Sequence, residues 1–109
     1  MKVVRILTRY SGMKKIDAIL KKLREYKPVL SKKYKVSKLE VFGSYIRKEQ
    51  KKGSDIDILV EFSETIDLFM YMELEGFLSS ILDVKVDLVM KDALKPRIKE
   101  NVLREAVPV

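Results

Sequence analysis

The sequence predicts an α+β fold, a small mixed β-sheet covered by helices. Three short apolar runs with the length of strands occur at about residues 38–42, 55–61 and 85–89. Segments with the apolar spacing of helices lie before, between and after these runs, so the expected order is helix–strand–helix–strand–helix–strand–helix. A chain of 109 residues has room for one domain with a single core. These observations predict one small sheet with helices packed against it.

The first helix is expected at residues 13–26, where apolar side chains follow helical spacing and lysines occupy the other face. Pro28 is expected to end or kink this helix, because proline lacks a backbone N–H and clashes with the preceding turn. Residues 29–34 are expected to add a further turn or two before the first strand. The apolar face of the helix is formed by Ile16, Ile19, Leu20 and Leu23.

Residues 1–12 are interpreted as an N-terminal extension of a domain that spans residues 13–109. The apolar run at residues 3–7 favours a short strand within the extension. Met13 is an alternative start, which favours a flexible appendage instead. Both interpretations stay open.

The elements after the first strand are marked by capping residues. A short helix is expected at residues 44–48, and Asp67 can cap the helix that follows the second strand and that Asp83 ends. Pro96 can open the final helix. The Met and aromatic content of the helix after Asp67 is interpreted as core filling rather than as a binding surface. This helix contains Leu68, Phe69, Met72, Leu74, Leu78, Ile81 and Leu82. In the final helix, Ile98, Val102 and Leu103 are expected to face inward.

The motif that says most about function runs from Gly43 to Asp57. Gly43-Ser44 closes the first strand, and Asp55 and Asp57 stand at the head of the second, after a ten-residue spacer. Two carboxylates two residues apart on a strand point to the same face, and they repel each other unless a cation compensates. One or two Mg²⁺ ions are the simplest compensation for such an oxygen cluster, and the Gly-Ser turn offers N–H groups to phosphates. The motif therefore predicts phosphoryl or nucleotidyl transfer.

A further acid, Asp87, interrupts the third apolar run. It is either a carboxylate at the edge of the sheet or a third metal ligand. The presence of Asp55 and Asp57 favours the second interpretation.

Composition excludes several kinds of chemistry. The chain has no cysteine and no histidine, which excludes the usual zinc sites, disulfides, thiol nucleophiles and triads that rely on imidazole. The absence of cysteine fits a cytoplasmic protein. No apolar run approaches the ~20 residues that span a membrane, so no membrane association is expected.

The net charge of +7 is distributed unevenly. Residues 1–53 carry 17 Lys and Arg against 4 Asp and Glu, whereas residues 54–92 carry 2 against 10. The asymmetry suggests a place where polyanion-binding and metal-binding surfaces meet, although a basic patch is more often a solvated face. Aromatic residues are not interleaved with the basic ones, so nucleic acid is not favoured as the main ligand.

Together, these motifs resemble the nucleotidyltransferase fold of the DNA polymerase β superfamily. The similarity is greatest to the minimal nucleotidyltransferases, which are the antitoxin partners of HEPN toxins, and it covers about residues 13–109. Ile46 and Lys48 depart from the family pattern, which often has a small residue and a glycine on either side of the arginine. The resemblance is carried by Gly43-Ser44, Asp55-Ile56-Asp57, Lys85-Val86-Asp87-Leu88-Val89 and the tail from Asp92 to Val107.

The resemblance implies a role for each acid. Asp55 and Asp57 would hold two Mg²⁺ ions that bridge the triphosphate. Asp87 would complete one metal site and help to deprotonate the attacking hydroxyl, because no histidine is available as a base. All three acids are present, which argues against an inactive site, because unused buried carboxylates only lower stability.

The resemblance also implies a phosphate site. Gly43 and Ser44 would bind the β- and γ-phosphates, and the guanidinium of Arg47 could reach the same phosphates. The alternative for Arg47 is a surface salt bridge with Glu49 or Glu61.

The function that the resemblance implies is Mg²⁺-dependent transfer of AMP from ATP to a hydroxyl, in this family a tyrosine of a partner HEPN toxin. The small size of the chain supports a protein acceptor, because no separate domain remains to bind another one. Two alternatives stay open: a non-catalytic antitoxin that masks its toxin by binding, and a catalytic subunit that acts on nucleic acid or a small molecule. No base-reading residues are identifiable, so the nucleotide preference also stays open.

Overall fold

The computed structural model describes residues 11–51 and 53–109. The first helix, α2, spans Ser11–Glu25 and so includes two residues of the predicted extension. The other ten residues of that extension lie outside the described part of the chain. Whether they form a strand or a flexible appendage therefore stays a prediction.

Four strands form one mixed sheet with the order β3-β2-β1-β4. Strand β1 runs antiparallel to β2 and to β4, and β2 runs parallel to β3. The predicted mixed sheet is confirmed, and each predicted strand is present within two residues of its expected bounds. Strand β4 is not among the predicted strands, because two residues give no alternating pattern. The strands are β1 (Val36–Phe42), β2 (Ile56–Phe62), β3 (Val86–Met90) and β4 (Val107–Pro108).

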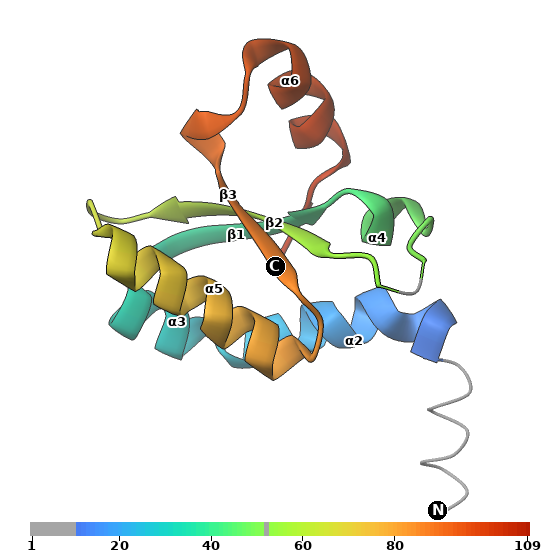
Figure 1. Ribbon diagram of the computed structural model, residues 1–109, viewed down its shortest axis with the longest axis horizontal. Coiled ribbons are helices and arrows are strands. Elements are labelled where there is room, and N and C mark those ends of the chain that lie inside the picture. Colours follow the sequence, from blue (N-terminus) through green and yellow to red (C-terminus); the bar gives the residue numbers. More distant parts are fainter. Residues whose placement is uncertain (1–10, 52) are drawn as a thin grey trace, which may run out of the picture.

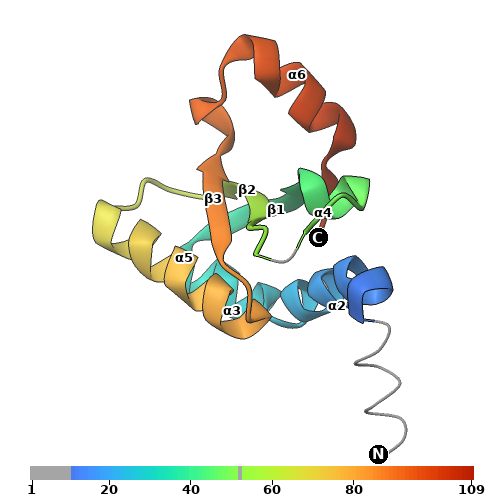
Figure 2. The same ribbon diagram turned by 45° about the vertical axis from the view of Figure 1, so that its right-hand side comes forward.

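The helices divide between the two faces of the sheet (Figure 1). Helices α2, α3 and α5 lie along one face, and α6 stands on the other side, as the turned view in Figure 2 also shows. The predicted caps of α5 are confirmed, since Asp67 Oδ1 accepts a hydrogen bond from Met70 N at 2.8 Å and Asp83 ends the helix in the left-handed conformation. After α2, the helical elements are α3 (Lys27–Tyr34), α4 (Ser44–Arg47), α5 (Leu68–Leu82), the 3₁₀ helix η1 (Lys91–Ala93) and α6 (Pro96–Glu105).

The core lies between the sheet and the three helices on its first face. Alternate residues of each strand point to opposite faces, so Ile58 and Leu88 enter the core while Asp57 and Asp87 point to the side of α6. The predicted apolar face of α2 is confirmed, because Ile19 and Leu23 are buried and Ile16 and Leu20 pack against the core. The helices contribute Ile19, Leu23, Leu30, Tyr34, Leu74 and Leu78 to this core.

The interpretation of the Met and aromatic content of α5 as core filling is confirmed for Met70, Tyr71 and Phe77, which pack against the core, and is wrong for Phe69 and Met72. Leu74 and Leu78 are fully buried, whereas Leu68, Phe69 and Met72 are 68%, 82% and 59% exposed. The physical reason is that the first turns of α5, residues 68–72, are apolar on all sides, and a helix lying on a sheet can bury only one side.

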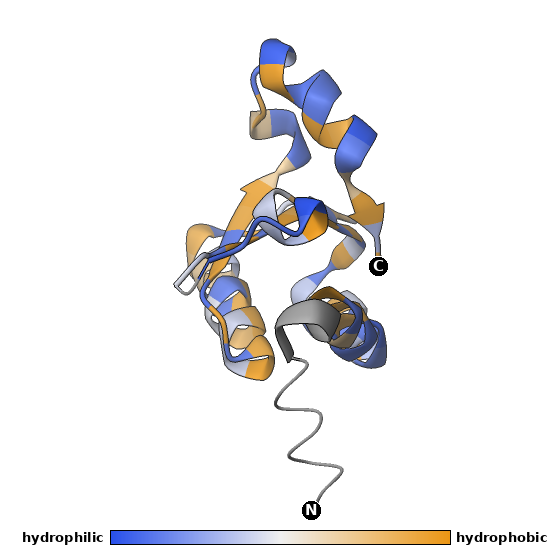
Figure 3. Ribbon diagram, turned by 90° about the vertical axis from the view of Figure 1, so that its right-hand side faces the viewer, coloured by the Kyte–Doolittle hydropathy of each residue, from blue (hydrophilic) through white to orange (hydrophobic). Residues whose placement is uncertain are grey.

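The prediction for α6 is also wrong in part. Val102 is buried, but Ile98 and Leu103 are 51% and 37% exposed. Among the described elements, no long helix packs along α6, which meets the short helix α4 only at its end through Glu105 and Arg47. Figure 3 shows that most residues of α6 are hydrophilic. Within the described ranges, no helix is both long enough and apolar enough to cross a lipid bilayer.

Candidate active site

The parallel pairing of β2 and β3 brings Asp57 and Asp87 together, because these two residues are register partners in adjacent strands. The pKa of Asp57 is raised from 3.8 to about 6. Burial is the largest cause, because it disfavours the charged form, and Asp87 adds charge repulsion and a hydrogen bond between the two side chains. Asp55, half-buried just ahead of β2, adds further repulsion. The structure therefore brings two of the three predicted acids side by side and places the third near them.

Strand β3 lies at one edge of the sheet, and side chains of α5 bond to its backbone. Ser79 Oγ accepts a hydrogen bond from Val86 N at 3.0 Å, and Glu75 Oε2 accepts one from Leu88 N at 3.1 Å. Tyr71 donates its hydroxyl hydrogen to the Leu88 carbonyl. These three side chains are spaced by four residues, so they share one face of α5.

The contacts from α5 tie down the residues on both sides of Asp87. Asp87 is thus a carboxylate at the edge of the sheet, as one interpretation expected. It is also a neighbour of Asp57, as its interpretation as a metal ligand requires. Sequence reasoning missed the role of Tyr71, Glu75 and Ser79. Their four-residue spacing is a signal, but only the packing of α5 on β3 gives it a meaning.

Gly43 lies against the side chain of Asp57. Its φ of +84° is in the region that favours glycine, and a Cβ added there would overlap Asp57 Oδ2 and lie 3.0 Å from Asp57 Cγ. The end of β1 therefore contacts the acidic pair directly. Ser44 follows as the first residue of α4 and is half-buried, so the Gly43-Ser44 turn and the acids adjoin as the motif predicts.

Arg47 and Gly43 share a partner that sequence reasoning missed. Glu105, the last residue of α6, accepts a hydrogen bond from Gly43 N at 2.7 Å and two from Arg47 Nη1 at 3.1 and 3.0 Å. Arg47 Nε also donates to Glu49 at 2.9 Å. The pKa of Arg47 is raised above its ordinary value, first by the hydrogen bond to Glu49 and then by Glu105.

The salt bridge to Glu49, which was the alternative to phosphate binding by Arg47, is present in the structure. The pairing with Glu61 is wrong, because Glu61 lies next to Lys91, with 3.7 Å between Oε2 and Nζ. Glu105 lies 58 residues from Arg47 in the chain, too far for any local pattern to connect them.

Lys48, one of the two residues that depart from the family pattern, forms the turn after Arg47. Helix α4 ends at Lys48, whose φ of 59° and ψ of 36° are left-handed. A glycine adopts this conformation without steric cost, whereas a lysine adopts it at some cost in stability.

The described residues contain no group of three or more Asp and Glu side chains close enough together to hold a metal ion as they stand. The two facing carboxylates of Asp57 and Asp87 are nevertheless an oxygen-donor pair of the kind that binds a hard divalent cation. Any third ligand from Asp55 would require its side chain to turn toward this pair.

The strands, the acidic pair and the Gly-Ser turn all lie in the part of the chain that a comparison with known families matches. The profile of the family named Nucleotidyltransferase domain matches residues 23–109. The chain belongs to this family. This nucleotidyltransferase domain is 50% identical over 98 residues to a relative from Methanocaldococcus jannaschii, which covers 89% of the chain and 100% of the relative. It is 44% identical over 98 residues to the protein adenylyltransferase MntA of Thermococcus cleftensis, covering 90% of the chain and 99% of that relative.

Solved structures confirm the fold of the nucleotidyltransferase domain. One described as a minimal nucleotidyltransferase has a TM-score of 0.70 at 39% identity, covering 83% of this chain and 92% of that one. A toxin–antitoxin structure with AMP-PNP has a TM-score of 0.61 at 33% identity, covering 84% and 69%. A structure of the tri-AMPylated Shewanella oneidensis HEPN toxin in complex with MNT antitoxin has a TM-score of 0.53 at 30% identity. The match covers 84% of this chain and 66% of the other.

Proposed function

We propose that this nucleotidyltransferase domain transfers AMP from ATP to a tyrosine hydroxyl of a partner HEPN toxin and so acts as its antitoxin. The observation that carries the proposal is the pair Asp57 and Asp87 beside the Gly43 turn. Relatives support it: one is named a protein adenylyltransferase, one structure holds AMP-PNP, and one contains an AMPylated HEPN toxin.

In the proposed reaction, the acceptor oxygen attacks the α-phosphorus of ATP, and the bond from that phosphorus to the bridging oxygen of the β-phosphate breaks. Pyrophosphate leaves, and the proton of the acceptor passes to a carboxylate, for which Asp87 is the candidate because it is exposed at the edge of the sheet. Gly43 N, Ser44 and Arg47 would hold the β- and γ-phosphates.

Mg²⁺ fits the chemistry of the acidic group, with Asp57 and Asp87 as the first ligands and Asp55 as the third. The pKa of Asp57 is raised first by burial and then by the charges of Asp87 and Asp55, and a hard divalent cation bound there would offset both effects. When bound, Mg²⁺ neutralises the triphosphate and stabilises charge on the attacking and leaving oxygens. We place the reaction in the cytoplasm, where ATP and Mg²⁺ are available.

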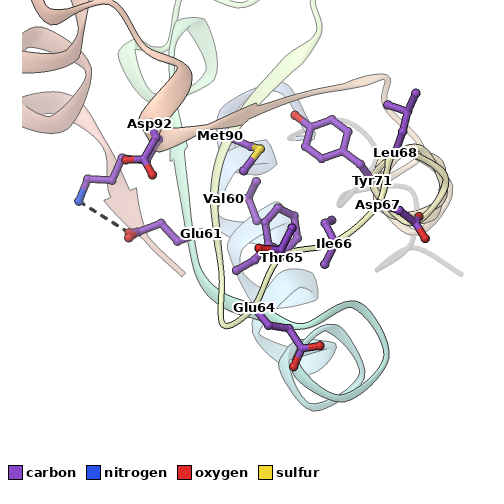
Figure 4. Close-up of a pocket in the computed structure, with 12 residues that line it drawn as sticks. Val60, Glu61, Glu64, Thr65, Ile66, Asp67, Leu68, Tyr71, Met90 and Asp92 are labelled. Carbon is purple, nitrogen blue, oxygen red and sulfur yellow. Dashed lines mark ion pairs between the residues drawn. The ribbon is translucent and has the colours of Figure 1, made fainter.

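An exposed apolar surface at the start of α5 supports a protein partner. Leu68, Phe69 and Met72 are exposed there. Leu68 also lines a groove of about 630 Å³ between α5 and the ends of β2 and β3 (Figure 4). Exposed apolar patches of this kind mark contact sites. The groove has an apolar floor and an acidic rim, which suit an apolar surface of the HEPN partner with basic residues around it. The charged residues of the groove are Glu61, Glu64, Asp67 and Asp92, together with Lys91, which pairs with Glu61 at 3.7 Å.

The same surface favours a second candidate function, in which the chain masks the toxin by contact alone. A third candidate, transfer to nucleic acid or to a small molecule, predicts strongly salt-dependent binding to the basic half of the chain. The acidic pair favours catalysis over both.

The deciding experiment is incubation of the chain with ATP, Mg²⁺ and the HEPN partner, read by intact mass. We expect whole AMP increments on a partner tyrosine, and none with Asp55→Asn/Asp57→Asn. Asp17→Asn, which changes an exposed carboxylate on α2, is the matched control and should act like the wild type. If no mass is added, and the complex forms equally well with the double variant, the chain acts by masking the toxin and not by catalysis.

A further inference from the structure

Glu105 binds Gly43 N and Arg47, two groups that bind the phosphates of ATP in the proposed function. The inference about Glu105 rests on that function. Its carboxylate accepts hydrogen bonds from Gly43 N at 2.7 Å and from Arg47 Nη1 at 3.0 and 3.1 Å. The Glu105 side chain is only 27% exposed. A carboxylate bound in this way resembles a phosphate oxygen bound by a backbone N–H and a guanidinium, because both are anionic acceptors of charge-assisted hydrogen bonds.

The backbone places Glu105 there. Strands β1 and β4 pair antiparallel, with Val41 opposite Val107. Continuing this register by two residues sets Glu105 opposite Gly43, and the 2.7 Å hydrogen bond agrees with that position. The short strand β4 thus holds the end of α6 beside the end of β1. Glu105 faces the Gly-Ser turn because of sheet pairing rather than by a chance contact of two long surface side chains.

The carboxylate and a triphosphate cannot use the same donors at once. The Gly43 N–H has one hydrogen to donate, and the hydrogen bonds of Arg47 Nη1 and Nε go to Glu105 and Glu49. A phosphate that approached while Glu105 stayed in place would also be repelled by its charge. Glu105 belongs to the last turn of α6, so a rotation of its side chain is enough to release Gly43 and Arg47.

We propose that Glu105 is an internal ligand of the phosphate subsite and sets the affinity for nucleotide. A triphosphate binds by replacing its carboxylate on Gly43 and Arg47. AMP carries a single phosphate, which belongs at the acidic pair, and so it does not compete with Glu105. The residue thereby controls the binding of ATP without contributing to the binding of AMP.

The test is calorimetric binding of AMP-PNP and of AMP, each with Mg²⁺, to the full chain and to Glu105→Gln. The amide of glutamine keeps the size of the side chain and removes its charge. We expect Glu105→Gln to bind AMP-PNP about tenfold more tightly, equivalent to about 1.4 kcal/mol, and to bind AMP as the wild type does. Glu105→Asp, whose shorter side chain cannot reach both partners, should also bind AMP-PNP more tightly. Glu100→Gln, on the same helix and paired with Arg104 at 3.4 Å, is the matched control and should change neither affinity.

Three outcomes would overturn the inference, and they are distinguishable. Weaker binding of AMP-PNP by Glu105→Gln and Glu105→Asp would mean that Glu105 positions Arg47 for the phosphates instead of competing with them. Equal binding by the wild type and both variants would remove the role of Glu105 and leave the proposed function intact. Absence of AMP-PNP binding in all forms, with normal thermal unfolding, would remove the proposed function together with the inference.

Discussion

At the scale of single residues, Asp57 is under the strongest constraints. It is partly buried, it shares a hydrogen bond with Asp87, and Gly43 leaves space for its carboxylate only because glycine has no side chain. Its position therefore depends on strand register on one side and on the absence of a Cβ on the other. Both constraints can be tested by single substitutions.

Gly43→Ala should damage the site more than Gly53→Ala. Both glycines have positive φ, +84° and +88°, so both substitutions strain the backbone. Only the Cβ at position 43 would overlap Asp57, since nothing lies within 4 Å at position 53. We expect Gly43→Ala to lower the free energy of unfolding by about 1–3 kcal/mol and to weaken AMP-PNP binding, both measured beside Gly53→Ala. Equal effects of the two substitutions would mean that the contact with Asp57 is unimportant.

The raised pKa of Asp57 predicts how stability depends on pH in the absence of divalent cations. The carboxyl titrates near 3.8 in the unfolded chain and near 6 in the folded one. Between these values the unfolded chain releases its proton first, so the free energy of unfolding should fall as pH rises from about 4 to 6. Asp57 is partly exposed, so solvent screening limits the loss to about 1–2 kcal/mol.

Urea unfolding between pH 4 and 7 measures this dependence. Asp57→Asn should remove the Asp57 part of the fall and be more stable than the wild type at pH 7, whereas Asp17→Asn should keep the wild-type profile. Adding Mg²⁺ at pH 7 should raise the stability of the wild type more than that of Asp57→Asn. Identical pH profiles for the wild type and Asp57→Asn would contradict the prediction.

At the scale of elements, α5 has three functions on three of its sides. Its apolar residues Leu74 and Leu78 enter the core, and its polar residues bond to the edge of β3 around Asp87. Its first turns expose Leu68 and Phe69 beside the acidic groove. The helix therefore connects the core, the acidic pair and the proposed partner surface.

Phe69→Glu should prevent complex formation with the HEPN partner without unfolding the chain. Phe69 is 82% exposed, so a charge there costs little in the isolated protein but is unfavourable in an apolar interface with carboxylates around it. We expect the dissociation constant to rise at least tenfold by calorimetry, with AMP-PNP binding unchanged. Ile98→Glu, at a 51% exposed apolar position on α6, is the control. The partner surface would have to be sought elsewhere if Phe69→Glu bound normally.

At the scale of the whole molecule, the sheet joins segments from most of the chain. Strand β4 is short, but the residue after it, Val109, makes two more hydrogen bonds. Val109 N donates to Leu39 O at 3.0 Å, and Lys27 Nζ donates to Val109 O at 3.1 Å. It covers the edge of β1, which would otherwise be free to pair with other chains.

Removal of residues 107–109 should therefore lower the free energy of unfolding by about 2–3 kcal/mol, from the loss of a few hydrogen bonds, and favour association through the open edge of β1.

Removal of residues 1–10 tests the predicted domain of residues 13–109, and we expect no change in the thermal midpoint. Thermal unfolding and light scattering of both shortened chains decide the two points. A large loss of stability on removing residues 1–10 would contradict the predicted extension.

The sequence by itself determined the fold class, three of the four strands and the acidic and Gly-Ser motifs. These features follow from patterns over a few residues, such as apolar alternation in the strands and the spacing of Asp55 and Asp57. The expected caps at Asp67 and Asp83 belong to the same group, because a cap depends on its own turn. The family resemblance rested on these local features and is confirmed.

Only the tertiary structure decided which side chains meet. The pairing of Asp57 with Asp87 depends on parallel register, and that of Glu105 with Gly43 and Arg47 depends on a two-residue strand that gives no pattern. The exposure of Phe69 likewise depends on which side of α5 contacts the sheet. In each case the contact joins segments far apart in the chain, and its free energy comes from packing of the whole fold rather than from the preference of any local sequence.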